Sequence, residues 1–443
     1  MAHHYETGLF RRLAAEIEKI KIIDTHEHLQ RDSELPPPDR VSIARFFAHY
    51  AICNLASVGM PIADKLRIQD TVEVIDSEEC WRLIKPWYQQ TRNTAYFEAL
   101  RIALRDLYGV EDFADETIAP LTGAMQREVR PGFTRRVFDR AGIDYAMNNP
   151  LGHRLIFNPD FDPACFIVDM VDHFTTLQVA QLADESGLEI GCLDDYLRVI
   201  DMYFERDARY AGAFKVGRAY DRTLYWEDVP RSAVEGTFNR LLAFNDCPDR
   251  REIQALEDFI MHYLVRKCGE YQLRMKFHTG FHEGNGNHIT NSHAALLTNL
   301  FLKYPGTNFD IYHISYPYQE EAALIAQTFP NVTINFCFVW IANPAMGRRA
   351  LSEMLDFVPV GKIHGFGGDY IFVEGSYGHA VMARREITRV LCEKVEEGRF
   401  TEEYALEVAH LLLRDNALAN FDLEKRAAAF KAHVAESVLT VQL

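Results

Sequence analysis

The sequence predicts an α/β fold in which eight parallel strands close into a (β/α)8 barrel, with a long, mostly helical insertion after the first strand. Short apolar segments of β type alternate with helical stretches, a pattern that indicates a parallel sheet. Successive strands after residue 140 are spaced about 38 residues apart, enough for a βαβ unit. No Gly-rich phosphate loop follows the first strand, although an open doubly wound sheet would normally carry one.

The first expected strand is "KIIDTHEH" at residues 21–28, which ends in two histidines. The other seven lie at 143–149, 165–171, 211–217, 273–280, 308–315, 331–339 and 362–370. A barrel with insertions can exceed ~400 residues as one domain. We therefore expect residues 1–443 to form a single barrel domain.

The segment between the first two strands, at about 35–140, is the expected helical insertion. Within it an apolar stripe repeats at helical spacing until Gly109, a natural helix stop; its members are Phe97, Leu100, Leu104, Leu107 and Tyr108. Such an insertion leaves the barrel at its C-terminal face and is a candidate lid over the active site. Helices used only for packing or for contact between subunits are the alternative. Another capped helix is expected from Thr401.

Composition restricts the classes of partner. Lys and Arg total 47 and Asp and Glu total 64, which gives a formal charge of −17 and disfavours nucleic acid or an anionic membrane as partner. No apolar segment approaches the ~20 residues of a membrane span, and the first twenty residues do not resemble a secretory signal. The eight cysteines are scattered, as expected for reduced thiols. We expect a cytoplasmic protein that acts on a small molecule, alone or as a homo-oligomer.

Histidines and carboxylates are the expected metal ligands. His26 and His28 are two apart in a strand, so their side chains face the same side ~6.6 Å apart and can converge on one ion. His278, His313 and Asp369 stand at the ends of later strands, and the carboxyl ends of barrel strands share one mouth. Taken singly, each has an ordinary interpretation as a hydrogen-bonded histidine or a turn-forming aspartate. Their shared position favours a site for zinc or a similar ion.

This pattern resembles the ligand and catalytic residues of the amidohydrolase superfamily, over about residues 20–420. The phrases "KFHTGF", "HISYPY", "NVTINF" and "GFGGDY" are similar to the amidohydrolase-2 branch, which contains hydrolases and decarboxylases. The helical segment 81–113 is more distantly similar to uronate isomerases, which share the barrel. The resemblance is specific for the superfamily and says little about the substrate.

The resemblance implies a set of four metal ligands: His26, His28, His278 and Asp369. It also implies that Asp369 is the general base, and that His313 is catalytic through a second ion or through contact with the substrate. Lys215, in "AFKVG" at the end of the fourth strand, is ambiguous. In members with two ions a lysine here is carboxylated and bridges them, whereas in other members it is no ligand. An ammonium paired with a carboxylate is the third interpretation.

Other residues near the mouth are candidate contacts for a polar or acidic substrate. An arginine can form a bidentate pair with a substrate carboxylate, although most arginines are simply solvated. The candidates are Tyr220, Arg222, His282, Trp340 and either Arg348 or Arg349.

The sequence therefore predicts a metal-dependent hydrolase that acts on an amide, lactone or ester of a small polar or acidic molecule. A bound divalent ion, for which the ligand chemistry favours zinc over Mn, Fe, Co or Ni, would activate water and polarise a carbonyl. A non-hydrolytic enzyme with the same site, either a uronate isomerase or a decarboxylase, is the main alternative. A metal-binding protein without catalysis is the least favoured.

Overall fold

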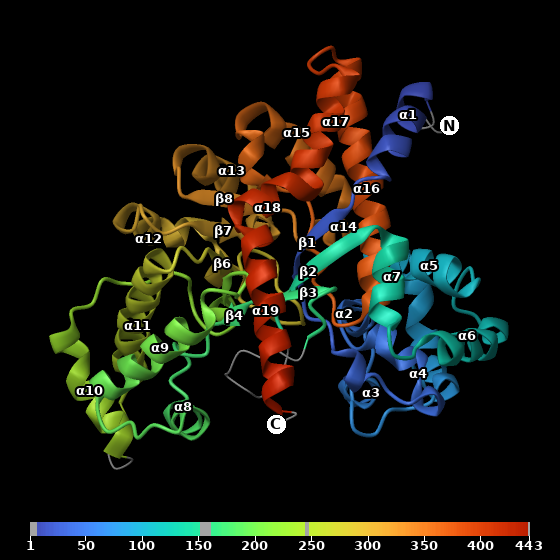
Figure 1. Cartoon of the computed structure of the whole chain (residues 1–443). Coiled ribbons are helices and arrows are strands. Elements are labelled where there is room, and N and C mark those ends of the chain that lie inside the picture. Colours follow the sequence, from blue (N-terminus) through green and yellow to red (C-terminus); the bar gives the residue numbers. More distant parts are fainter. Residues whose placement is uncertain (1–6, 151–160, 244–247, 442–443) are drawn as a thin grey trace.

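The computed structural model describes residues 7–150, 161–243 and 248–441, and its parallel strands confirm the predicted α/β barrel (Figure 1). Each of the eight predicted segments contains a strand, and the third is divided in two at Asp169. β1 to β3 form one sheet and β4 to β9 another, each in sequence order. The strands are β1 Ile22–Glu27, β2 Ile143–Asn148, β3 Phe166–Val168, β4 Met170–Val171, β5 Phe214–Val216, β6 Met275–Phe277, β7 Phe309–Ile311, β8 Val332–Asn335 and β9 Ile363–His364.

Backbone hydrogen bonds join the first strand to the segment that follows the last one. Thr25 N donates to Phe366 O at 3.3 Å, Asp369 N donates to His26 O at 2.8 Å, and His28 N donates to Tyr370 O at 2.9 Å. We call this junction of β1 with residues 366–370 the seam. The seam closes the barrel where no regular strand ladder is formed between β1 and β9.

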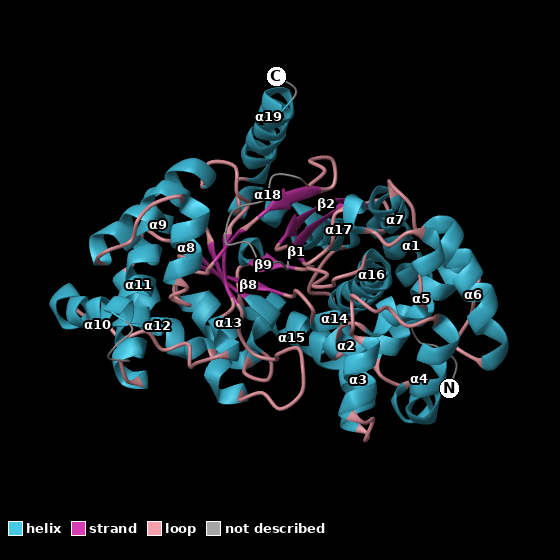
Figure 2. Cartoon of the chain, turned by 90° about the horizontal axis from the view of Figure 1, so that it is seen from below, coloured by secondary structure: helices cyan, strands magenta, loops and turns pink. Residues whose placement is uncertain are grey.

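Helices surround the strands, as Figure 2 shows from below. The insertion between β1 and β2 consists of α2 Tyr50–Ser57, α3 Ile62–Ile68, α4 Ser77–Thr91, α5 Ala95–Tyr108, α6 Asp115–Glu128 and α7 Phe133–Ala141. The remaining helices are α1 Gly8–Ile17, α8 Val179–Ser186, α9 Leu193–Asp207, α10 Arg231–Ala243, α11 Arg250–Glu270, α12 Thr298–Lys303, α13 Gln319–Thr328, α14 Val339–Ala342, α15 Pro344–Phe357, α16 Val373–Glu396, α17 Glu402–His410, α18 Asn416–Asn420 and α19 Leu423–Val441.

Two helix boundaries follow the sequence signals. Helix α5 ends at Gly109, whose φ of 71° lies in the left-handed region that glycine adopts without steric cost. Helix α17 begins after Thr401, whose side chain accepts a hydrogen bond from Tyr404 N. Within the described ranges, no helix has both the length and the apolarity needed to cross a bilayer.

An ion pair occupies the interior of the barrel. Lys276 Nζ lies 2.7 Å from Asp169 Oδ2, and both side chains have 0% exposure. The same ammonium donates to Thr25 O at 2.7 Å. Because Asp169 separates β3 from β4, these contacts tie β1, β6 and the divided third strand together.

Replacing Lys276 with Met should lower the free energy of unfolding by about 3–5 kcal/mol, because the carboxylate of Asp169 would remain buried without its partner. Urea denaturation followed by circular dichroism measures the change. The double variant Lys276→Met/Asp169→Leu should regain part of the loss. Lys19→Met, which removes an exposed pair with Glu16, is the control and should change little. If Lys276→Met and Lys19→Met changed the free energy of unfolding equally, the buried pair would have no special structural role.

Candidate metal centre

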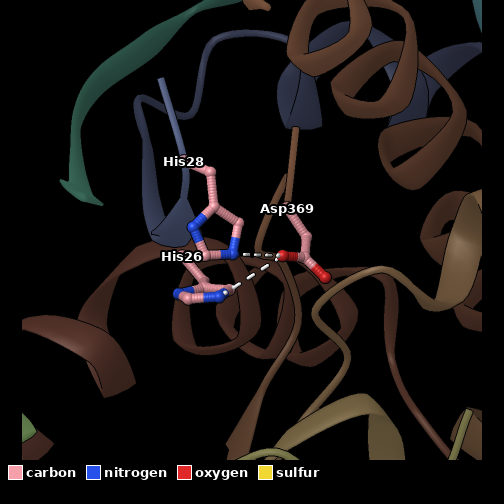
Figure 3. A group of neighbouring side chains, drawn as sticks. All are labelled: His26, His28 and Asp369. Carbon is pink, nitrogen blue, oxygen red and sulfur yellow. Dashed lines mark ion pairs between the residues drawn. The ribbon is translucent and has the colours of Figure 1, made fainter. Parts of the chain in front are cut away.

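His26, His28 and Asp369 meet at the mouth of the barrel (Figure 3). Nε2 of His26 and Nε2 of His28 each lie 3.3 Å from Asp369 Oδ1. The two histidines come from the end of β1, and Asp369 lies in the seam segment after β9. Its φ of 60° is in the left-handed region, which aspartate tolerates better than most residues. The predicted convergence of the first strand and the last one is thus observed.

The hydrogen bonding of His28 shows why a cation fits between these groups. Nδ1 of His28 lies 2.7 Å from Asn149 O, and since a carbonyl only accepts, the ring nitrogen donates. Nε2 is then the ring nitrogen left to face Asp369 and to bind a cation. Burial lowers the pKa of His26 well below its ordinary value, which favours the form that binds metal ions. Two imidazoles and a carboxylate around one point suit zinc and related ions.

Asp369 is held as a carboxylate by its neighbours. Burial alone would raise its pKa, but the adjacent histidines His26, His28 and His313 outweigh burial and hold the pKa well below its usual value. Tyr50 donates its hydroxyl to Asp369 Oδ2 at 2.7 Å. Because Tyr50 belongs to α2, the helical insertion orients a residue of the candidate metal centre.

Two buried carboxyl groups hold the seam in place. Asp24 Oδ1 accepts from Gly368 N at 3.0 Å and from His26 N at 3.1 Å, while Glu27 Oε2 accepts from Tyr370 N at 2.7 Å. A Cβ at Gly368 would lie 1.8 Å from Glu27 Oε1, so this position has no room for a side chain. Burial, followed by the proximity of Asp24, raises the pKa of Glu27 well above its usual value. The glutamate between the two histidines therefore fixes the backbone that carries Asp369.

His278 and His313 form a second pair beside the first group. Nδ1 of His278 lies 3.1 Å from Nε2 of His313, and the latter atom lies 3.9 Å from Asp369 Oδ2. Within the described residues, His278 is not part of the donor group formed by His26, His28 and Asp369. The expected set of four ligands around one point is thus divided, because His278 faces His313.

Lys215, in β5, lies next to the first group. Its Nζ is 3.4 Å from His26 Nε2 and 4.5 Å from the centre of the Tyr312 ring. Burial lowers the pKa of this ammonium to about 8, so the group is mostly protonated at pH 7 but loses its proton more readily than an ordinary lysine. The lysine thus stands where it could contact an ion, a substrate or, after carboxylation, both.

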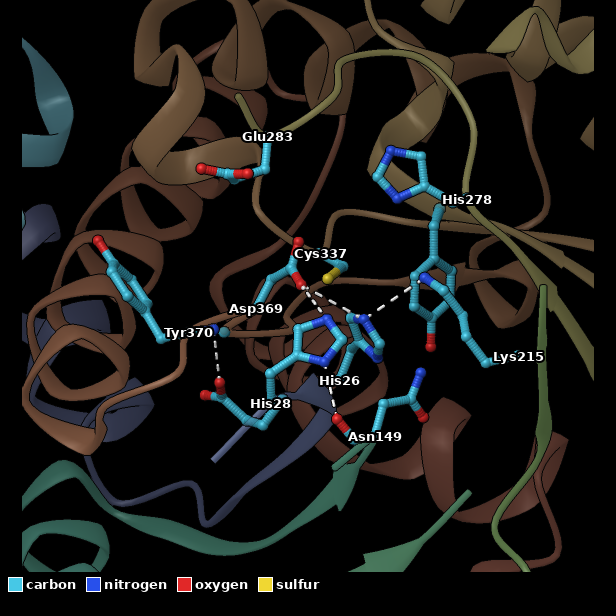
Figure 4. Close-up of polar contacts among 12 residues, drawn as sticks. His26, His28, Asn149, Lys215, His278, Glu283, Cys337, Asp369 and Tyr370 are labelled. Atoms are coloured by element: carbon cyan, nitrogen blue, oxygen red, sulfur yellow. Dashed lines mark hydrogen bonds and ion pairs between the residues drawn. The ribbon is translucent and has the colours of Figure 1, made fainter. Parts of the chain in front are cut away.

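A cavity of about 360 Å3 opens beside these groups, and Figure 4 draws several residues of its wall, among them His28, Lys215 and Glu283. Its wall includes His28, His49, Tyr50, Lys215, Tyr220 and Glu283. His49 and Tyr50 come from the insertion, which also contacts the loop after β6: Cys53 Sγ lies 3.3 Å from Glu283 Oε1, and Asn285 Nδ2 donates to Cys53 O at 3.1 Å. The insertion therefore contributes to the cavity wall, as a lid would.

The structure separates the candidate substrate contacts into two groups. Tyr220 lines the cavity, and the buried His282 packs against it with ring centres 4.6 Å apart. Arg222 is instead held by Glu257 at 2.8 Å and Asp258 at 2.5 Å.

Trp340 and Arg348 are likewise engaged away from the cavity. Trp340 is buried and donates Nε1–H to Gly365 O at 2.9 Å, and Arg348 pairs with Glu386. The alternative Arg349 is exposed, 3.9 Å from Glu353. The expectation that Arg222, Trp340 or Arg348 binds the substrate is not supported, because these polar groups already have partners in the fold.

Several residues of the site carried no usable signal in the sequence. Tyr50 and His49 lie in an insertion with no strand to place them, and Asn149 acts through its backbone carbonyl. Glu27 is easily noticed between two histidines, but its role could not be predicted because its partners in the seam are more than three hundred residues away in the sequence.

Comparison with known proteins gives a family profile and one curated relative. The profile of the amidohydrolase family matches residues 166–423, more than half of the chain. Protein fluG of Emericella nidulans is 28% identical over 156 residues, which are 34% of this chain and 18% of fluG. This match therefore spans less than a fifth of the relative.

Solved structures share the fold at low sequence identity. A uronate isomerase from Thermotoga maritima has a TM-score of 0.75 and 14% identity, with 93% of this chain and 97% of that chain covered. A glucuronate isomerase from Caulobacter crescentus has a TM-score of 0.74 and 17% identity, with 96% and 95% covered. A protein from Lactobacillus casei described as a metal-dependent hydrolase has a TM-score of 0.65 and 17% identity, with 94% and 98% covered.

We expect at least one tightly bound divalent ion per chain, measured by elemental analysis after dialysis. His28→Ala should weaken binding by more than the roughly 10–100-fold that loss of an outer partner costs, because it removes a donor atom. His49→Ala, which changes the cavity wall without removing a member of the donor group, is the control. Protein from metal-replete medium that is fully active with near-zero Zn, Mn, Fe, Co and Ni would disprove the metal centre.

Proposed function

Since the chain belongs to the amidohydrolase family, we propose that it is a metal-dependent hydrolase that cleaves an amide, lactone or ester of a small polar molecule. The observation that carries this proposal is the meeting of His26, His28 and Asp369 around one point at the open end of the barrel. We also propose that the chain is one barrel domain with the insertion as its lid.

His26, His28 and Asp369 would hold the ion, which would supply an activated water and polarise the substrate carbonyl. Asp369 is the residue that accepts the proton in this proposal, because it is ionised and its Oδ2 is fixed by the Tyr50 hydroxyl at 2.7 Å. His313 Nε2, 3.9 Å from the same oxygen, is placed to take the proton onward or to contact the substrate.

The cavity wall suggests a polar substrate. Imidazoles, phenols and Lys215 line it, and these groups suit hydroxyl, carbonyl and amide functions. Among the described residues of the wall there is no arginine, so a carboxylate on the substrate would depend on Lys215 or on the ion. An acidic substrate therefore fits the site only if its carboxylate lies next to Lys215 or the ion.

Isomerisation of a uronic acid, or decarboxylation, is the second candidate. The supporting observation is the helical insertion, since the alignment with the Thermotoga maritima uronate isomerase covers 93% of this chain and thus most of the insertion. The same residues could then move a proton between carbon atoms. The absence of an arginine from the described cavity wall weighs against a tightly held uronate.

A mixed substrate panel separates these reactions. Hydrolysis incorporates oxygen-18 from labelled water into the product, isomerisation interconverts aldose and ketose, and decarboxylation releases carbon dioxide. We expect label incorporation with an amide, lactone or ester. Turnover of a uronic acid without any response to the hydrolysable compounds would replace the proposed reaction with isomerisation.

Asp369→Asn keeps the size of the side chain and removes its basicity, so turnover should fall by roughly 10²–10⁴-fold. Metal content should change less, because His26 and His28 remain. The measurements are turnover, elemental analysis and thermal melting, with the exposed Asp221→Asn as control. A variant that melts normally, keeps its ion and turns over at the parental rate would show that another residue is the base, and His313 would be examined next.

Lys215→Ala tests the bridging role, because a carbamate bridge requires two cations. If Lys215 bridges, the parent should hold two ions and the variant fewer, and added bicarbonate should raise the content of the parent alone. Elemental analysis with and without bicarbonate gives the answer. Two ions in both proteins would exclude bridging, and one ion in the parent would leave Lys215 as a substrate contact.

A further inference from the structure

A second group of donor atoms lies behind Asp369. A ring nitrogen of His313, Sγ of Cys337 and a carboxylate oxygen of Asp369 all lie within 4.8 Å of one another. All three residues are buried, with 1%, 0% and 4% exposure. Figure 4 shows the sulfur of Cys337 close to the Asp369 carboxylate. Nothing in the sequence distinguished this cysteine from the other scattered thiols.

Hydrogen bonds orient the two histidines of this region with their lone pairs toward each other. His313 Nδ1 lies 3.0 Å from Cys337 O, and His278 Nε2 lies 3.1 Å from Phe281 O. Because carbonyl oxygens only accept, both of these nitrogens carry the proton. The other ring nitrogens, Nε2 of His313 and Nδ1 of His278, are then the ones left to bind a cation. These two nitrogens are 3.1 Å apart, a distance that requires either a shared proton or a cation between them.

The separation of these nitrogens suits two ligands of one ion. Two imidazole nitrogens at ~2.0–2.1 Å from a tetrahedral zinc lie ~3.3 Å apart, close to the observed 3.1 Å between His278 and His313. Among the described residues, the donor group of Cys337, His313 and Asp369 does not include His278, so His313 is the histidine common to the pair and to this group.

Asp369 offers one oxygen to each group. Its Oδ1 is 3.3 Å from His26 and His28, whereas its Oδ2 is 3.9 Å from His313. A carboxylate in this position can contact two ions at once. A thiolate at Cys337 would add the negative charge that a second divalent ion requires.

The space for the sulfur is provided by Gly367. A Cβ at Gly367 would lie 2.9 Å from Cys337 Sγ and 2.8 Å from its Cβ. The glycine therefore lets the thiol lie against the seam, beside Asp369. A buried thiol that only packs against the barrel wall would use the same space, so the experiment must distinguish packing from metal ligation.

We propose that Cys337 is the thiolate ligand of a second metal position, shared with His313 and Asp369 and bordered by His278. A sulfur ligand favours thiophilic divalent ions such as Zn2+ and Co2+ over Mg2+ or Mn2+. The inference rests on the proposed function only because Asp369 would be a ligand of both ions, the one beside His26 and His28 and the one beside Cys337. The second position itself follows from the geometry around Cys337.

X-ray absorption spectroscopy of the zinc-loaded parent protein tests the ligation without any substitution. We expect two zinc ions per chain by elemental analysis and a zinc–sulfur distance of ~2.3 Å. Two ions without sulfur scattering would overturn the role of Cys337. One ion without sulfur would overturn the second position and leave the proposed function intact, whereas no bound ion would overturn both.

Cobalt substitution provides the matched variants. The cobalt-loaded parent should show a sulfur-to-cobalt charge-transfer band in the near ultraviolet, and Cys337→Ser should lose this band together with one of its two ions. Cys53→Ser, whose thiol also lies beside the cavity near Glu283, should keep the band and both ions. Thermal melting confirms that the variants are folded. Retention of the band in Cys337→Ser would assign the sulfur to another cysteine and overturn the proposal.

Discussion

The seam between β1 and residues 366–370 closes the barrel and carries the donor atoms of the candidate metal centre. Its backbone hydrogen bonds place Asp369 opposite His26 and His28, and the buried carboxyl groups of Asp24 and Glu27 hold the two segments together. Asp369 also adopts a left-handed backbone there. A shift of either segment would therefore move histidine and aspartate apart, so the geometry of the site depends on the closure of the fold.

The barrel and the position of the candidate donors at one mouth could be predicted because both depend on short-range rules. Alternating apolar segments located the strands, and the common direction of parallel strands placed their final residues at one mouth. The grouping of the donors could not be predicted in the same way. His278 and His313 end neighbouring strands, and their carbonyl partners turn them toward each other and away from His28.

Whether a charged candidate reaches the cavity depends on the helices around it, whose positions cannot be predicted from the order of the strands. Arg222 follows β5 by only a few residues, which suggested a place at the mouth, yet Glu257 and Asp258 on α11 bind its guanidinium. In contrast, Tyr50 reaches Asp369 from the insertion, which is also tied to the start of α16 where Tyr108 and Arg45 contact Glu374 at 2.9 and 3.1 Å. The two interpretations of the insertion are thus compatible, because the same helices pack against the barrel and line its cavity.

The seam also determines when the protein can become functional during synthesis. Glu27 and Tyr370, which meet there, are 343 residues apart in the chain. At ~5–20 residues per second, a ribosome needs roughly 17–70 s to make the intervening segment. Throughout that time His26 and His28 have no Asp369 to complete their donor group. A nascent chain or a prematurely terminated product therefore holds an incomplete ligand set, and activity begins only after nearly the whole polypeptide has emerged.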